Sequence, residues 1–273
     1  MRTANSRAGG LTAHVTGNGP SIVFLHSLLS DRGSLEPVVR LLADDFRLVL
    51  LDLPGFGGSP RVGGGLDGQA DAVAEAVRVL CPQERPILFG NGYGSFLALS
   101  TALRHPGLTR GLFLAGCGAA FTEQGQGAFR FMAAKAQESG LEAIAETAMR
   151  RLFPPEMAAK VPDIVAERRA SFVATDLETF REACGLLASL DLRQRTRDLD
   201  VPVFACAGSL DEATPPAMAE ELARLAPQGT FHEIAACAHV PTLQAPQEVA
   251  TQLRRFALAA TAPTATAAAE LAP

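Results

Sequence analysis

Residues 86–97 constrain the fold of this chain most strongly, because an apolar segment runs directly into a glycine-rich turn and then into a helix. Residues 86–89 are typical of a buried strand. The turn that follows carries three glycines at alternate positions of residues 90–94, and glycine permits tight turns and close backbone contacts. Apolar residues then recur on one side of a helix that begins near Tyr93. The stretch therefore predicts a strand, a tight turn and a helix in direct succession.

Strand-like and helix-like segments alternate along the rest of the chain. Predicted strands cover residues 11–15, 21–26, 47–52, 86–89, 111–117, 201–208 and 230–234, and further predicted helices cover residues 36–43, 69–80, 216–225 and 246–258. This alternation predicts an α/β fold with a mostly parallel sheet flanked by helices. We assign residues 1–120 and 200–260 to this core, and residues 261–273, which are rich in Ala, Thr and Pro, to a disordered tail.

Residues 121–199 differ from the core, because their apolar residues follow helical spacing and include no convincing strand. We expect an inserted helical cap over the carboxyl ends of the parallel strands, where it excludes water and shapes a pocket. Phe153 and Arg130 are the pocket candidates from this segment. If the substrate carries a carboxylate, one inward-pointing arginine would suit it by bidentate pairing. The arginines available in the segment include Arg130, Arg150, Arg151, Arg168, Arg169 and Arg193.

The composition of the chain restricts the class of partner. The 273 residues carry a formal net charge of -5 and contain no long basic run, which argues against a nucleic-acid partner. No stretch approaches the roughly 18 uninterrupted apolar residues of a membrane span, so we expect a cytoplasmic protein that does not enter a membrane. The five cysteines lack metal-ligand spacing and are expected to be reduced and mostly buried. These observations predict a small-molecule substrate, no metal or other cofactor, and a monomer or homodimer.

Two polar residues in the last third of the chain follow predicted strands. Asp211 comes after the strand at residues 201–208, and His239 comes after the strand at residues 230–234. Both positions lie at the carboxyl edge of a parallel sheet, where active-site loops gather. An acid placed there can hold an imidazole in one tautomer and stabilise its protonated form. The alternative is structural: Asp211 caps the helix that begins near Pro215, and His239 is a loop histidine with ordinary hydrogen-bond partners.

The chain order of glycine-rich turn, acid and histidine resembles that of the α/β-hydrolases. Within that superfamily the chain is most similar to the 3-oxoadipate enol-lactonases. The matching stretches cover nearly the whole chain and comprise residues 23–28, 52–59, 90–94, 140–145, 190–193 and 211–216, and His239. The resemblance implies a hydrolase fold with a water-excluding helical cap and a small, often carboxylated substrate.

At one position the chain departs from the Gly-x-Ser-x-Gly pattern of that superfamily. Gly92 stands where the family has its nucleophilic serine, and Asn91 stands where a histidine or an apolar residue is common. Ser95 cannot substitute, because it falls outside the pattern and inside the predicted helix. The resemblance therefore implies an intact turn, acid and base without the serine.

The resemblance also implies which backbone groups stabilise an oxyanion. In the fold these are the amide after the nucleophile and an amide in the loop after the strand that ends at His26, which here indicates the N–H groups of Tyr93 and Leu28. His26 and Ser27 are candidate pocket residues in that loop. The Tyr93 hydroxyl can point into the pocket or pack under the cap, and the sequence leaves both orientations open.

The favoured function is hydrolysis of a small lactone, ester, carbamate or amide by a water molecule that the Asp211–His239 pair deprotonates. The missing serine side chain is expected to leave room for that water beside His239. Two alternatives remain open. One is a cofactor-free lyase, isomerase or oxygenase in which His239 abstracts a substrate proton, and the other is a non-catalytic protein that binds a ligand in a hydrolase-derived pocket.

Overall fold

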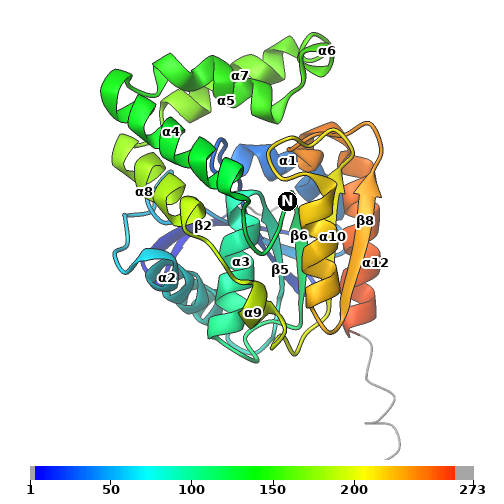
Figure 1. The fold of residues 1–273 in the computed structure, drawn as a ribbon. Coiled ribbons are helices and arrows are strands. Elements are labelled where there is room, and N and C mark those ends of the chain that lie inside the picture. Colours follow the sequence, from blue (N-terminus) through cyan, green and yellow to red (C-terminus); the bar gives the residue numbers. More distant parts are fainter. Residues whose placement is uncertain (1–3, 262–273) are drawn as a thin grey trace, which may run out of the picture.

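The computed structural model describes residues 4–261, whose strands form one eight-stranded sheet with helices on both faces (Figure 1). The strands are β1 (Ala4–Ala8), β2 (Leu11–Thr16), β3 (Ser21–Leu25), β4 (Arg47–Leu51), β5 (Ile87–Asn91), β6 (Gly111–Ala115), β7 (Val203–Gly208) and β8 (Gly229–Ile234). Their order in the sheet is β1-β2-β4-β3-β5-β6-β7-β8. Strands β3 to β8 pair in parallel, whereas β1 and β2 are antiparallel. The predicted α/β fold with a mostly parallel sheet is confirmed.

The helices that cover the sheet are η1 (Arg32–Leu35), α1 (Glu36–Leu42), α2 (Gly65–Leu80), α3 (Tyr93–Arg104), α10 (Pro216–Leu225), α11 (Pro241–Gln244) and α12 (Pro246–Thr261). Between β6 and β7 the chain forms α4 (Glu123–Ser139), η2 (Glu142–Ile144), α5 (Ala145–Leu152), α6 (Pro155–Ala158), α7 (Pro162–Val173), α8 (Leu177–Ala188) and α9 (Arg193–Thr196). Helices α4 to α8, here named the helical insertion, lie above the edge at which the parallel strands end (Figure 1). Its role as a cap, and the division of the chain into core and cap, stay predictions.

Alternate residues of the central strands pack on opposite faces of the sheet, as the strand period of two requires. In β3, Val23 and Leu25 belong to the hydrophobic cluster that contains the buried side chains of α2 and α3. Ile22 and Phe24 belong to the cluster that contains those of α1 and α12. These two clusters hold β3 rigidly, and the loop that leaves β3 reaches the candidate site.

Four phenylalanines at matching positions of β3, β5, β6 and β7 align these strands. Neighbouring ring centroids lie 4.9 Å, 5.5 Å and 4.7 Å apart across the sheet. The residues are Phe24, Phe89, Phe113 and Phe204, and each is the register partner of the next. Because a shift of one residue would move a ring to the other face, this row fixes the level at which the four strands end.

Two expectations about element boundaries need correction. Strand β1 was not predicted, because Ala4–Ala8 has small and polar residues without apolar alternation and is held mainly by pairing with β2. Helix α2 begins at Gly65 and not at residue 69, since Gly64 adopts φ +86° and serves as the residue before the helix. The predicted disordered tail falls on residues 262–273, outside the described residues, apart from Thr261 at the end of α12.

Candidate active site

The turn between β5 and α3 consists of one residue, Gly92, with φ +53° and ψ -120°. Residues with a side chain rarely adopt this positive φ. The turn also lies directly against β3, because a Cβ atom added to Gly94 would overlap the carbonyl oxygen of Leu25. Close packing against the backbone therefore explains Gly90 and Gly94, and the turn places residue 92 at the carboxyl edge of the sheet.

Ser95 lies in the first turn of α3 and does not face the site. Its Oγ donates a hydrogen bond to the Gly92 carbonyl oxygen at 2.6 Å, and its backbone N–H donates to the same oxygen at 2.8 Å. The hydroxyl is thus part of the helix start. This position agrees with the expectation that Ser95 lies inside the helix.

Asp211 and His239 meet in the loops that follow β7 and β8. His239 Nδ1 lies 2.9 Å from Asp211 Oδ2, and the two side chains are 8% and 0% exposed, respectively. Because a carboxylate only accepts hydrogen bonds, Nδ1 carries the proton and Nε2 is the accepting nitrogen. A Cβ atom added to Gly92 would lie 3.0 Å from Nε2. The basic nitrogen of His239 therefore faces the turn.

Three further donors surround the Asp211 carboxylate. The N–H groups of Ala213 and Thr214 each donate to Oδ1 at 2.9 Å, and Thr214 Oγ1 donates to Oδ2 at 2.8 Å. Burial raises the pKa of Asp211, but the charge of His239 and the hydrogen bonds from His239 and Thr214 outweigh burial and hold the pKa below its ordinary value. Asp211 is therefore ionised at neutral pH. It accepts hydrogen bonds within its own loop and pairs with His239. The alternative that Asp211 caps the following helix is wrong, because α10 starts after Pro215 without a side-chain cap.

Thr214 is a site residue that the sequence reasoning did not single out. Its Oγ1 also lies 3.2 Å from His239 Nδ1, so one hydroxyl contacts both members of the pair. A hydroxyl residue three positions after an acidic residue is typical of a loop in which the carboxylate accepts local N–H groups. That spacing is the signal from which Thr214 could have been identified.

Asn91 connects the turn to the histidine loop. Its Nδ2 donates to the carbonyl oxygens of Ala115 and His239, each at 3.2 Å. Its Oδ1 is buried and has no hydrogen-bond partner within residues 4–261. The Asn91 amide thus links the backbone of His239 to the strand that leads into Gly92.

His26 is not a pocket residue, which corrects the prediction. The ring is fully buried, its Nδ1 lies 2.9 Å from the Ser27 carbonyl oxygen, and its Nε2 accepts from the Leu53 N–H at 3.3 Å. Burial lowers the pKa of His26 and so favours the neutral ring. Both ring nitrogens are therefore used by backbone groups, and His26 fixes the course of the loop that begins with Ser27.

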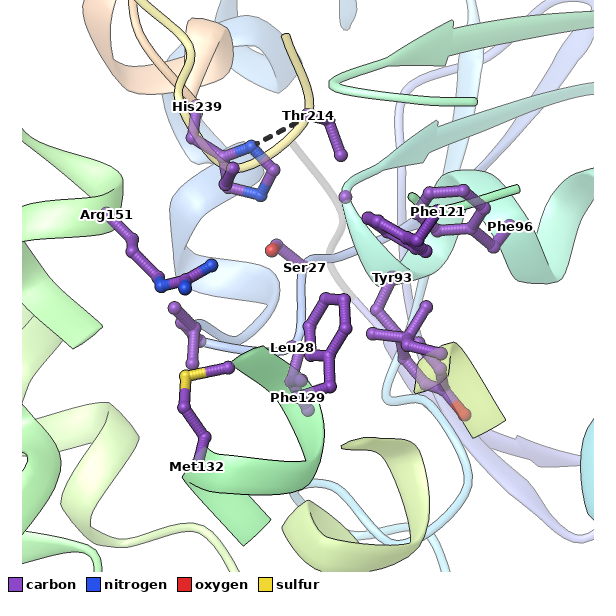
Figure 2. Close-up of a pocket in the computed structure, with 14 residues that line it drawn as sticks. Ser27, Leu28, Tyr93, Phe96, Phe121, Phe129, Met132, Arg151, Thr214 and His239 are labelled. Atoms are coloured by element: carbon purple, nitrogen blue, oxygen red, sulfur yellow. Dashed lines mark hydrogen bonds between the residues drawn. The ribbon is translucent and has the colours of Figure 1, made fainter. Parts of the chain in front are cut away.

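A small, mostly apolar cavity lies between Gly92, His239 and the helical insertion (Figure 2). The volume open to the centre of a water-sized sphere is about 30 Å³, enough for roughly two water molecules. The lining residues are Ser27, Leu28, Leu29, Gly92, Tyr93, Phe96, Phe121, Phe129, Met132, Arg151, Leu187, Ala213, Thr214 and His239. Polar side chains contribute to this lining mainly through Ser27, Arg151, Thr214 and His239.

The two predicted oxyanion donors, the N–H groups of Leu28 and Tyr93, belong to residues that line this cavity. Neither N–H has a hydrogen-bond partner among the described residues. Tyr93 is the first residue of α3, where N–H groups are unsatisfied and the helix dipole favours negative charge. The Tyr93 hydroxyl points away from the cavity and donates to Gln69 Oε1 at 2.6 Å (Figure 2).

Phe153 and Arg130 do not line the cavity, which corrects two more predictions. Phe153 directly follows α5 and is buried in the hydrophobic core. Arg130 is exposed, and its Nη1 lies 3.5 Å from the carbonyl oxygen of Ala188 in α8. Arg151 reaches into the cavity instead (Figure 2). Helical spacing alone did not determine which face of each helix points toward the sheet.

Within residues 4–261, no group of three or more His, Cys, Asp or Glu residues is arranged to hold a metal ion, and no helix has the length and apolar character of a membrane span. The free cysteines Cys81, Cys117, Cys184, Cys206 and Cys237 are all buried, as predicted. Burial raises the pKa of Cys184 to about 12, so its thiol is protonated at neutral pH.

Comparison with known families agrees with this geometry. Residues 22–252 match the sequence pattern of the alpha/beta hydrolase family. The chain belongs to this family, and the predicted resemblance to α/β-hydrolases is confirmed.

Named relatives include several esterases. The pimeloyl-[acyl-carrier protein] methyl ester esterase of Methylococcus capsulatus is 30% identical over 255 residues, which cover 90% of this chain and 98% of the relative. The enzyme of the same name from Aeromonas hydrophila is 26% identical over 250 residues, with 88% and 96% covered. These names support a hydrolase.

Solved structures with the same fold include an enol-lactonase and a thermophilic esterase. The enol-lactonase from Burkholderia xenovorans LB400 has a TM-score of 0.85 and 24% identity, and the match covers 93% of this chain and 99% of that chain. The esterase from Thermogutta terrifontis has a TM-score of 0.84 and 22% identity, with 96% and 100% covered. At these identities the likeness shows the fold.

Proposed function

We propose that this protein hydrolyses a small, carboxylated ester or lactone by direct attack of a water molecule, with His239 as general base and no serine nucleophile at residue 92. The observation that carries the proposal is the position of His239 Nε2, which faces Gly92 across the cavity while Asp211 holds Nδ1. Gly92 offers no side-chain atom to acylate, so the space beside Nε2 is available to water. The esterase and enol-lactonase names of relatives support hydrolysis, and a protein that only binds its ligand has no chemical use for this pair.

In the proposed reaction His239 takes one proton from the attacking water and later gives it to the leaving oxygen. The water oxygen attacks the substrate carbonyl carbon while Nε2 of His239 takes a proton from the water. The carbonyl oxygen becomes an oxyanion that accepts hydrogen bonds from the N–H groups of Leu28 and Tyr93. Collapse of this intermediate breaks the bond to the leaving oxygen, which receives the proton from His239. An ester then gives an acid and an alcohol, and a lactone gives a hydroxy acid.

Asp211 supports both proton transfers without being protonated itself. Its lowered pKa keeps it ionised, and its negative charge stabilises the imidazolium that forms after His239 takes the proton. The hydrogen bond to Nδ1 also keeps the lone pair on Nε2, toward the cavity. The pair thus supplies the base, its orientation and its charge compensation.

Arg151 supports a carboxylated substrate. Among the arginines of the helical insertion, Arg150 pairs with Glu146 and Arg168 pairs with Asp31, and Arg169 pairs with Glu142. Arg151 has no ion-pair or hydrogen-bond partner within residues 4–261, and its guanidinium points into an otherwise mostly apolar cavity (Figure 2). An unpaired guanidinium in such surroundings favours an anionic ligand group, and a carboxylate matches its two-pronged geometry.

Helices of the helical insertion form part of the cavity wall, so we propose that they move when a substrate enters. Arg151 lies in α5, and Phe129 and Met132 of the lining lie in α4. We therefore place the entrance where α4 and α5 cover the site, and we expect their closure over bound substrate to exclude bulk water.

Replacement of Arg151 tests the substrate class. We expect Arg151→Met to raise KM for a half-ester of a dicarboxylic acid by roughly 10- to 100-fold, the range for loss of a charged hydrogen-bond partner. KM for the matching neutral diester should change by less than about threefold. The measurement is steady-state hydrolysis of both esters, with Arg150→Met as a control, because Arg150 is exposed and paired with Glu146.

Two results would count against the proposal. If the wild-type protein hydrolyses no member of a panel of lactones, esters, carbamates and amides, with and without a carboxylate, the hydrolase function is wrong. If Arg151→Met affects the half-ester and the diester equally, hydrolysis stands but the carboxylate preference does not.

A further inference from the structure

The side chain of Ser27 occupies part of the space that a side chain at residue 92 would need. Ser27 is the second residue after β3, and it is almost completely buried. A Cβ atom added to Gly92 would lie 2.5 Å from Ser27 Oγ and 3.1 Å from Ser27 Cβ. Real Cβ atoms do not approach other atoms to 2.5 Å, so a side chain at residue 92 would force the Ser27 hydroxyl out of its present position.

The Ser27 hydroxyl has no hydrogen-bond partner among the described residues, although it lines the cavity. The backbone of Ser27 is well anchored, since its carbonyl oxygen contacts His26 Nδ1 at 2.9 Å and accepts from the Ser30 N–H at 3.3 Å. An unsatisfied hydroxyl on an anchored backbone, directed into a cavity, has to find its hydrogen-bond partner outside the chain.

His239 Nε2 faces the same small space from the other side. The position of a Cβ atom on Gly92 would be 3.0 Å from Nε2 and 2.5 Å from Ser27 Oγ. Figure 2 shows the Ser27 hydroxyl directed toward the His239 ring, and no direct hydrogen bond joins them. One water molecule, with hydrogen bonds of about 2.8 Å to each side, can connect the two groups.

We infer that Ser27 is a catalytic residue whose hydroxyl holds the attacking water against His239. This inference rests on the proposed function and names one more group in the same site. One O–H of the water donates to Nε2 and is the bond that breaks, and the other donates to Ser27 Oγ. The water oxygen then keeps a lone pair for the substrate carbonyl carbon, whose oxygen reaches the N–H groups of Leu28 and Tyr93. No co-reactant besides water is required.

Two variants of Ser27 test the inference. Ser27→Ala should lower kcat by roughly 10- to 100-fold for a hydrolysed ester, with KM within about twofold, because the water is no longer positioned. Ser27→Gly should keep more activity than Ser27→Ala, since the vacated space admits a second water in place of the hydroxyl. A packing role predicts the reverse order, because glycine leaves a larger void and a more flexible loop. Ser100→Ala, which removes a buried hydroxyl of α3 without a partner, is the matched control.

The outcomes separate this inference from the proposed function. If His239→Ala loses hydrolysis while Ser27→Ala retains the wild-type kcat, the role of Ser27 is wrong and the general-base hydrolysis stands. An acyl group mapped to Ser27 by peptide mass spectrometry also overturns the inference, since Ser27 is then the nucleophile. If hydrolysis does not depend on His239, the proposed function itself falls. Thermal unfolding midpoints within a few degrees of the wild type show that the variants are folded.

Discussion

His239→Ala should lower kcat/KM for any hydrolysed substrate by about 10²- to 10⁴-fold, the range expected for loss of a positioned general base. Among residues 4–261, the His239 imidazole is the only side chain of the cavity lining that has an accepting ring nitrogen. This nitrogen, Nε2, faces Gly92. Without it, water lacks a proton acceptor beside the carbonyl group. Steady-state hydrolysis of a half-ester measures the loss. His232→Ala is a suitable control, because His232 lies on the half-exposed strand β8 and pairs with Glu248 of α12.

Asp211→Asn should act through the same unit. The asparagine oxygen can still accept the N–H groups of Ala213 and Thr214, but an amide group facing Nδ1 favours the wrong tautomer of His239. Residues that act together give non-additive effects, so the double variant with His239→Ala should be hardly slower than His239→Ala itself. Independent, multiplying effects of the two substitutions would show that they are not one catalytic pair.

Gly92→Ser should not restore a serine hydrolase when it is made alone. The new Cβ would lie 2.5 Å from Ser27 Oγ, and the residue keeps a positive φ, a conformation that costs on the order of 1–3 kcal/mol with a side chain. The side chain would also fill the space proposed for the attacking water. We therefore expect native hydrolysis to fall by more than about tenfold, with weak labelling by a fluorophosphonate.

The double variant Ser27→Gly/Gly92→Ser should behave differently, because removal of the Ser27 side chain relieves this overlap. A serine at residue 92 then lies beside His239 Nε2 and the two backbone N–H groups, so fluorophosphonate labelling should appear at residue 92, together with hydrolysis of activated esters through an acyl intermediate. Ser27→Gly/Gly92→Ala provides the same Cβ without a hydroxyl and should remain unlabelled. Higher native activity in Gly92→Ser alone would show that the open space beside His239 has no part in the mechanism.

Much of the fold could be predicted from the sequence, because it depends on local patterns. Alternating apolar strands and amphipathic helices indicate a parallel sheet, and a parallel sheet brings the loops after β7 and β8 to one edge. Asp211 and His239 could therefore be placed together from their order in the chain, and they lie 2.9 Å apart at their nearest atoms. Strand β1 could not be predicted, since pairing with a neighbour determines it more than its own residues do.

The detailed lining of the site could not be predicted, because it depends on contacts between distant segments. The spacing of arginines in residues 121–199 did not distinguish Arg151 from its paired neighbour Arg150. His26 directly precedes the site loop, but its ring is buried in the core, where Nε2 accepts a hydrogen bond from the Leu53 N–H. The overlap between Ser27 and Gly92 arises only after β3 and β5 are neighbours in the sheet. Local periodicity carries no information about such contacts.

Rapid-quench intact-mass spectrometry of the wild-type protein during turnover tests the central claim most directly. The protein is mixed with an excess of a slowly hydrolysed carboxylated ester or carbamate, quenched in acid at a series of times, and weighed while product is quantified in the same samples. Direct attack by water predicts an unmodified protein mass at every time and a linear release of product without a burst. A mass increase equal to the acyl group, on any residue and in step with turnover, would contradict hydrolysis without a covalent intermediate.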